Sequence, residues 1–146
     1  AIANDGTVYN LSLISKVTDS DGNTLEEKEA DVYGEVDLAQ STWDCIQTGM
    51  YEVIQNMDSY SDMGINVAGK TGTAQQTESR PNHALSIGYA PYENPELAIS
   101  CRISFGYTSS NAAEVCRDIF KYYFGLEDKD ALITGEASQA AVAIGD

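Results

Sequence analysis

The sequence predicts an α+β domain in which an antiparallel sheet is flanked by helices. The expected elements follow the order strand pair, helix, three strands, helix, which differs from the repeated strand-helix-strand units of a parallel fold. The last three strands are joined by short connections, which favour antiparallel pairing because parallel neighbours need a long crossover. The composition is globular, since 42% of the 146 residues are hydrophobic and 21% are charged.

The first predicted element is a hairpin or a pair of strands within residues 7–36. Residues 7–18 are rich in β-branched and apolar side chains, and the more polar stretch that follows ends at Val36. Between them, Asp21 and Gly22 form a dipeptide typical of hairpin turns, so we interpret the segment as a turn rather than a calcium loop.

The second predicted element is an amphipathic helix capped at Ser41. Ser41 and Asp44 have the spacing of a capping box, in which two side chains satisfy free backbone N–H groups. Apolar side chains then recur at helical spacing, at Trp43, Ile46, Met50, Val53 or Ile54, and Met57. We interpret this stripe as core packing rather than a cofactor site.

Three strands are predicted next, over residues 65–75, 84–91 and 97–105. Residues 91–95 contain two prolines and make the tight connection between the last two strands. We expect the three strands to form one antiparallel ladder.

The last predicted helix begins at Asn111, where Glu114 follows at capping-box spacing. One face carries Val115, Ile119, Tyr122 and Leu126, with Cys116, Phe120 and Tyr123 beside it. Residues 1–126 are therefore expected to form the folded part. Residues 127–146, acidic and then rich in Ala, Gly and Ser, are expected to form a flexible tail or linker.

The charge of the chain argues against nucleic acid as a partner. There are 8 Lys and Arg against 23 Asp and Glu, which gives a net charge of −15. A field of this sign repels phosphate backbones and anionic lipid headgroups. No apolar run is long enough to span a bilayer, and residues 1–6 do not resemble a signal peptide, so we expect a piece of something longer.

The cysteines and the single histidine form no recognisable metal or catalytic set. Cys45, Cys101 and Cys116 show neither a CxxC pair nor a Cys/His cluster, so we expect buried free thiols and no zinc site. His83 has no accompanying GxSxG element and is interpreted as a residue at the start of a strand. The sequence predicts no metal and no cofactor.

Residues 64–71, which read GINVAGKT, match the phosphate-binding P-loop pattern GxxxxGK[ST]. A P-loop needs a buried strand before it and a helix directly after it. Here the preceding residues are polar, the following ones are poor helix formers, and Ile65 and Val67 alternate as in a strand. A P-loop nucleotide-binding domain is the alternative from another class; it predicts magnesium-dependent ATP or GTP binding that is lost in Lys70→Ala.

The same residues can form a strand that binds a peptide end. Lys70 and Gly72 then point to one face, and Thr71 and Thr73 point to the other. Gly72 would let a substrate backbone lie against the strand. A cation, hydroxyls and free N–H groups suit an anionic peptide end and a developing oxyanion.

Three stretches carry a resemblance to a known family. They are residues 67–75 (VAGKTGTAQ), 82–84 (NHA) and 88–96 (GYAPYENPE). They resemble the transpeptidase domain of class B high-molecular-weight penicillin-binding proteins, in which KTG is the third motif after SxxK and a Ser-x-Asn or Ser-Asp-Asn element. The resemblance implies the C-terminal portion of the fold shared by penicillin-binding proteins and serine β-lactamases.

The resemblance further implies a serine D,D-transpeptidase of peptidoglycan synthesis, which β-lactams inhibit as substrate mimics. On the family pattern, Lys70 supplies positive charge, and the Thr71 and Thr73 hydroxyls hold the substrate carboxylate. The N–H of Thr73 would be an oxyanion donor, and Gly72 would permit close approach. The family also implies an extracytoplasmic location and a membrane anchor in the parent protein, with no anchor in this chain.

The sequence departs from the family pattern at the nucleophile. SxxK needs a serine three residues before a lysine, and no serine holds that position before Lys16, Lys28, Lys70, Lys121 or Lys129. Ser109, Ser110 and Asn111 match Ser-x-Asn but follow KTG, so we interpret them as a helix cap. We expect the chain to carry one wall of the site and to be inactive alone.

Two further expectations follow. Within the family, the alternative is a non-catalytic module that senses or binds β-lactams on the same fold. Because such a domain packs its sheet between helices from both halves of the chain, this piece should expose apolar surface. It is then expected to self-associate or to bind the missing N-terminal part of the domain.

Overall fold

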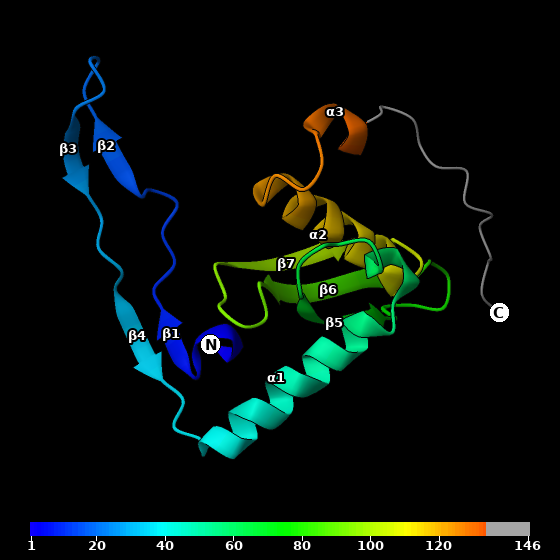
Figure 1. The fold of residues 1–146 in the computed structure, drawn as a ribbon. Helices are drawn as coiled ribbons and strands as arrows, with labels where there is room; N and C mark the ends of the chain where they lie inside the picture. Colours follow the sequence, from blue (N-terminus) through cyan, green and yellow to red (C-terminus); the bar gives the residue numbers. More distant parts are fainter. Residues whose placement is uncertain (134–146) are drawn as a thin grey trace. The chain divides into compact units, whose positions relative to one another are not determined.

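The structure is a computed structural model that describes residues 1–133 (Figure 1). It is α+β, with antiparallel sheets and helices. The chain divides into two compact units, Ala1–Ile46 and Gln47–Asp146, and helix α1 (Gln40–Gln55) crosses the boundary between them. Within the described range, no helix is long and apolar enough to cross a membrane. Most of the expected tail at residues 127–146 lies outside the described residues.

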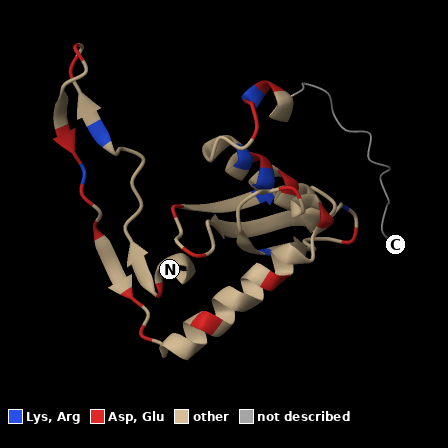
Figure 2. Ribbon diagram, in the orientation of Figure 1, with Lys and Arg blue, Asp and Glu red and all other residues tan. Residues whose placement is uncertain are grey.

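The first unit is an interrupted antiparallel hairpin. Its elements are η1 (Ile2–Asn4), β1 (Thr7–Tyr9), β2 (Lys16–Thr18), β3 (Thr24–Glu27) and β4 (Val32–Glu35). β1 pairs with β4 and β2 pairs with β3, which confirms the predicted hairpin but splits it into two short ladders. In Figure 2 the red positions of Asp and Glu are distributed along its ribbon.

The turn of this hairpin forms where it was predicted. The Asp19 carboxylate accepts hydrogen bonds from the backbone N–H groups of Asp21 and Asn23, at 2.9 and 2.8 Å. Hydrogen bonds from Asn23 also hold the pKa of Asp19 below its ordinary value. Gly22 has a φ of 87°, a conformation that glycine adopts without steric cost.

Helix α1 begins at Gln40, so the predicted cap at Ser41 is wrong. The Ala39 carbonyl accepts hydrogen bonds from the N–H groups of Thr42 and Trp43, which places Ser41 inside the first turn with its side chain exposed. An N-cap residue precedes the first turn and has non-helical backbone angles, so a serine within that turn cannot be the cap.

The buried stripe of α1 is confirmed at three positions. Trp43, Met50 and Ile54 are buried, whereas Ile46 is exposed. A Cβ on Gly6 would lie 3.0 Å from the Trp43 ring and 2.4 Å from the Val36 carbonyl oxygen. Glycine at position 6 therefore allows the Trp43 indole and the backbone of Val36, which follows β4, to pack closely against it within the first unit.

The second unit is a three-stranded antiparallel sheet with one long helix packed on it. The strands are β5 (Ala68–Ala74), β6 (His83–Ala90) and β7 (Leu97–Ile103), in the order β5-β6-β7. This confirms the predicted ladder, although two strands are shorter than predicted: β5 begins at Ala68 rather than at residue 65, and β7 ends at Ile103 rather than at residue 105. Helix α2 (Ser109–Tyr123) contacts all three strands, and η2 (Asp58–Tyr60) and α3 (Lys129–Leu132) are short. The sequence did not predict α3.

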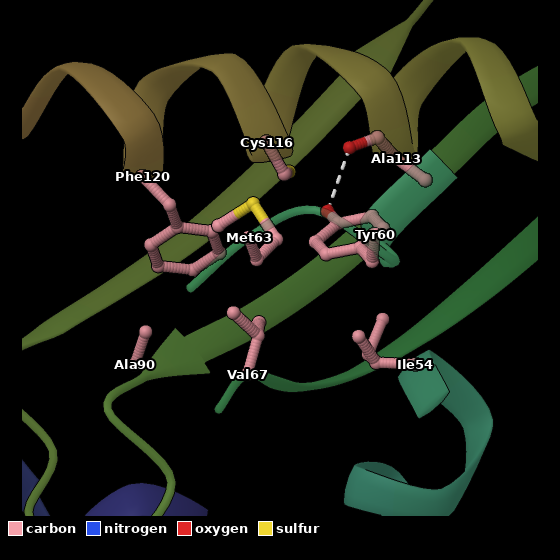
Figure 3. Close-up of a cluster of buried hydrophobic side chains, with 8 residues drawn as sticks. All are labelled: Ile54, Tyr60, Met63, Val67, Ala90, Ala113, Cys116 and Phe120. Atoms are coloured by element: carbon pink, nitrogen blue, oxygen red, sulfur yellow. Dashed lines mark hydrogen bonds between the residues drawn. The ribbon is translucent and has the colours of Figure 1, made fainter. Parts of the chain in front are cut away.

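The core of this unit lies between α2, the sheet and the end of α1 (Figure 3). Its buried members are Ile54, Tyr60, Met63, Val67, Ala90, Ala113, Cys116 and Phe120. The Tyr60 hydroxyl donates a hydrogen bond of 2.7 Å to the Ala113 carbonyl, which satisfies the one polar group of this tyrosine inside the core. Burial raises the pKa of Tyr60 above its ordinary value.

The buried face of α2 includes only part of the apolar positions that the sequence identifies on this helix. The residues packed on the sheet are Ala112, Ala113, Cys116 and Phe120, whereas Val115, Ile119 and Tyr122 are 40%, 42% and 61% exposed. Small side chains at the contact let the helix backbone approach the sheet, and Phe120 fills the remaining space. The wider apolar stripe consequently faces outward.

The cysteines also correct the sequence analysis in part. Cys116 is buried, Cys101 is half-buried and Cys45 is exposed, so the expectation of buried thiols fails at Cys45. Cys45 lies off the buried stripe of α1. Burial raises the pKa of the Cys116 thiol to about 11.

Lys121 is the charged residue that ties α2 to its surroundings. Its Nζ lies 2.9 Å from the Asp62 carboxylate and 2.9 Å from the Glu127 carboxylate. Hydrogen bonds to Glu127 and Asp62 raise the pKa of Lys121, and the bond from Lys121 lowers the pKa of Asp62. The cluster connects the end of α2 to the segment after η2 and to the segment before α3.

Candidate functional site

Strand β5 is the edge strand that carries the four candidate residues. Lys70 lies opposite Ile87 of β6, Thr71 opposite Ser86, Gly72 opposite Leu85, and Thr73 opposite Ala84. Within the described residues β5 pairs with β6 alone, so its second edge carries no strand. An edge of this kind can hydrogen-bond an extended peptide as an added strand.

The two faces of β5 have different surroundings. Thr71 and Thr73 point to the face that α2 covers, and the Thr73 Oγ1 accepts a hydrogen bond of 3.2 Å from the backbone N–H of Ser109. Lys70 is exposed on the opposite face, and its Nζ donates to the Thr71 carbonyl at 2.7 Å. The ammonium therefore lies at the backbone of the strand, against the Thr71 carbonyl.

Two glycines of the motif have different physical roles. A Cβ on Gly69 would lie 2.8 Å from the Ile87 carbonyl oxygen and 3.0 Å from the Ile54 Cδ1, so internal packing requires glycine there. A Cβ on Gly72 would meet nothing closer than Leu85, at an ordinary 3.7 Å. The packing of the chain itself therefore does not require glycine at position 72.

The P-loop alternative is wrong. Lys70 and Thr71 lie in the middle of a strand, and β5 continues to Ala74 instead of opening a helix. Without a helix N-terminus directly after the lysine, the loop cannot direct N–H groups at a phosphate. Among residues 1–133 there is also no group of three or more His, Cys, Asp or Glu side chains that could hold a metal ion.

The last helix has an N-cap, but the cap is not the predicted Asn111. The N-cap of α2 is Thr108, whose side chain accepts a hydrogen bond of 3.1 Å from Ser110 N–H. Asn111 lies in the first turn, and its Nδ2 donates to the Gly106 carbonyl at 2.8 Å. Thr108 has extended backbone angles, which a cap requires and which a residue inside the helix cannot have.

A set of contacts that the sequence analysis missed surrounds the end of β5. His83, at the start of β6 as predicted, binds the backbone N–H of Phe105 through Nδ1 at 3.0 Å. Its Nε2 lies 2.9 Å from Gln76 Oε1. No local pattern signals these contacts, because their partners lie 22 and 7 residues away.

Comparison with known proteins gives a consistent result. The model of the penicillin binding protein transpeptidase domain matches residues 1–121. The chain is 29% identical over 144 residues to the peptidoglycan D,D-transpeptidase MrdA of Haemophilus influenzae, covering 84% of this chain and 22% of that protein. It is 27% identical over 150 residues to penicillin-binding protein 2A of Bacillus subtilis, covering 88% and 21%.

Solved structures agree in fold. Penicillin-binding protein A of Mycobacterium tuberculosis, an imipenem acyl-enzyme complex, has a TM-score of 0.71 at 21% identity, covering 86% of this chain and 28% of that one. PBP2 of Pseudomonas aeruginosa has a TM-score of 0.65 at 27% identity, covering 88% and 28%. The chain thus spans between 21% and 28% of these four proteins.

Proposed function

The chain belongs to the penicillin-binding protein transpeptidase family, and from this premise we propose that it supplies the substrate-binding strand of a peptidoglycan D,D-transpeptidase. The observation that carries the proposal is β5, an edge strand that presents Lys70, Thr71, Gly72 and Thr73 in the order of the family's KTG motif. A peptidoglycan stem peptide that ends in D-Ala-D-Ala would lie along this edge as an added strand.

In the proposed reaction a serine outside this chain attacks the carbonyl of the penultimate D-Ala. The bond to the terminal D-Ala breaks, that residue leaves with a proton, and an acyl-enzyme remains. An amine of a second stem peptide then takes the acyl group and regenerates the serine. A β-lactam reacts by the same attack, but its ring opens and the leaving group stays attached.

Each candidate residue has a proposed role in binding or in the transition state. The Lys70 ammonium, which lies against the Thr71 carbonyl, supplies positive charge near the anionic chain end. The hydroxyls of Thr71 and Thr73 donate hydrogen bonds to the substrate carboxylate, and the N–H of Thr73 stabilises the oxyanion. The room at Gly72 lets the substrate backbone approach.

We propose that the chain does not react alone, because no serine stands three residues before any lysine. Its proposed partners are the stem peptide and β-lactams, both bound in the complete domain, and the N-terminal part of that domain. The parent protein is proposed to be extracytoplasmic and membrane-anchored, as family resemblance implies.

The test is intact-mass analysis after incubation with a reactive β-lactam. Two samples are compared, this chain and a longer protein extended N-terminally through the parent reading frame. We expect an adduct on the longer protein alone. No adduct on either sample would contradict the proposal, and an adduct on this chain would show that its nucleophile lies within residues 1–146.

A variant pair tests the assigned strand in the longer protein. Lys70→Ala should slow acylation by about 10²–10³, the usual loss for one electrostatic group of a transition-state site. Lys16→Ala is the matched control, because Lys16 lies exposed on β2 of the other unit. Equal acylation rates for the two variants would show that Lys70 takes no part in the site.

A further inference from the structure

Residues 104–108 connect β7 to α2. Two contacts hold this segment at the end of the sheet, one to β6 and one to Asn82, the residue that precedes β6. The Phe105 N–H donates to His83 Nδ1 at 3.0 Å, and the Tyr107 N–H donates to the Asn82 carbonyl at 3.0 Å. Phe105 and Tyr107 have φ values of 57° and 67°, an uncommon conformation for non-glycine residues. External contacts must maintain this geometry, because such residues do not favour it by themselves.

His83 has one proton arrangement that satisfies both of its ring nitrogens. A backbone N–H can only donate, so Nδ1 must accept from Phe105 and the ring proton resides on Nε2. Nε2 then donates to Gln76 Oε1 at 2.9 Å. The ring is buried and lies 4.8 Å from the Phe105 ring, so its orientation is fixed by packing as well.

The same segment determines how the Thr73 hydroxyl is oriented. The residue that follows the segment is Ser109, whose N–H donates to Thr73 Oγ1 at 3.2 Å. This bond uses a lone pair of the oxygen and leaves the hydroxyl proton free. Thr73 can therefore donate to an anionic group at the edge of β5 without first breaking an internal bond.

We propose that His83 is a positioning residue for Thr73, acting through the segment from Phe105 to Ser109. The inference rests on the proposed function only in assigning the anionic group as a substrate or β-lactam carboxylate. His83 fixes Phe105, the segment then places the Ser109 N–H, and that N–H orients the Thr73 hydroxyl as a donor. His83 itself touches no substrate.

Two amide substitutions of His83 test whether the acceptor at the position of Nδ1 is the atom that matters. In His83→Asn, the side-chain oxygen lies two bonds from Cβ, as Nδ1 does, and can still accept from Phe105. In His83→Gln, the oxygen lies three bonds from Cβ and matches Nε2 instead. Both variants lose the aromatic ring, so they control for its packing.

The first measurement is hydrogen exchange by mass spectrometry in the longer protein. We expect His83→Gln to increase exchange of the Phe105 and Ser109 amides at least tenfold, and His83→Asn to keep their protection close to that of the unsubstituted protein. Unchanged protection in His83→Gln, or equal loss in both variants, would overturn the proposal. This measurement does not depend on whether the protein reacts with β-lactams.

The second measurement is a double-mutant cycle on the second-order rate constant of β-lactam acylation. We expect His83→Gln to reduce this constant about tenfold, since one hydrogen bond to a charged group is weakened, and His83→Asn to restore most of it. In a Thr73→Ala background, His83→Gln should have no further effect. Additive losses would show that His83 does not act through Thr73, whereas complete absence of acylation in the unsubstituted protein would contradict the proposed function instead.

Discussion

Gly69 and Gly72 lie on the same strand, but a side chain at each position would meet different neighbours. Gly69→Ala should lower the free energy of unfolding by about 1–3 kcal/mol, because the added Cβ meets the Ile87 carbonyl oxygen at 2.8 Å. Gly72→Ala should leave stability unchanged or raise it by up to about 1 kcal/mol. Urea unfolding of both variants is the measurement, and each serves as the control for the other. A large loss in Gly72→Ala would mean that position 72 is required for folding rather than for access.

The Lys121 cluster predicts a pH-dependent contribution to stability. The pKa of Asp62 is lowered in the folded chain, so its contribution is present above the unfolded value of about 3.9 and is lost as pH falls through the folded pKa. The pKa of Lys121 is raised, so its contribution is present below about 10.4 and is lost at higher pH. Lys121→Met should therefore destabilise the chain between these limits.

The measurement is the difference in unfolding free energy between Lys121→Met and the unsubstituted chain as pH varies. Lys129→Met is the control, because Lys129 forms no ion pair among the described residues. A difference that persists undiminished at pH 2 would assign the effect to packing of the lysine stem instead of to its charge.

Residue types and their order were sufficient to predict β5 and the faces of Lys70 and Thr73. Strand alternation is a local rule that assigns Lys70 and Thr73 to opposite faces, but it did not locate the start of the strand, because Ile65 and Val67 precede β5. The bond from Ser109 to Thr73 could not be predicted, because it joins residues 36 positions apart and depends on the path of an intervening segment.

Helix starts offer a test at the level of elements. Thr108→Ala should lower the free energy of unfolding by about 1 kcal/mol, because Thr108 caps α2 and accepts from Ser110 N–H. Ser41→Ala should change it by less than about 0.5 kcal/mol, because Ser41 is exposed within α1. Thermal unfolding of the two variants is the measurement. A larger loss of unfolding free energy in Ser41→Ala than in Thr108→Ala would indicate that Ser41 caps α1 after all.

The orientation of α2 shows where local pattern reasoning ends. The apolar stripe through Val115 and Ile119 was identified correctly as apolar, but it is not the face that packs on the sheet. Periodicity locates apolar faces, whereas the choice between two of them depends on the shape of the partner surface. Ala113 and Cys116 fit that surface because they are small.

At the scale of the whole molecule, exposed apolar side chains predict association. Leu11 and Leu13 are almost fully exposed in the first unit, and Tyr33 is 77% exposed. In the second unit, a groove between α2 and α3 is lined by Val115, Ile119, Tyr122, Leu132 and Ile133. Monomeric proteins rarely leave so much large apolar side chain uncovered.

We therefore expect light scattering to report a mass that rises with concentration for this chain and a constant mass for the longer protein. Ile119→Ser should reduce the rise if the groove takes part, whereas Glu114→Gln, at an exposed position of the same helix, should not. A monomeric mass that stays constant as this chain is concentrated would contradict the expectation.

The division of the chain into two units has a consequence for optical spectroscopy. Trp43 is the single tryptophan and is packed against Gly6 in the first unit, so indole fluorescence follows the unfolding of that unit. Circular dichroism near 222 nm, the helical band, instead follows mainly the second unit, which holds α2 and the larger part of α1. If the two units unfold independently, the two signals will give different midpoints in one titration, and a single sample will report two stabilities.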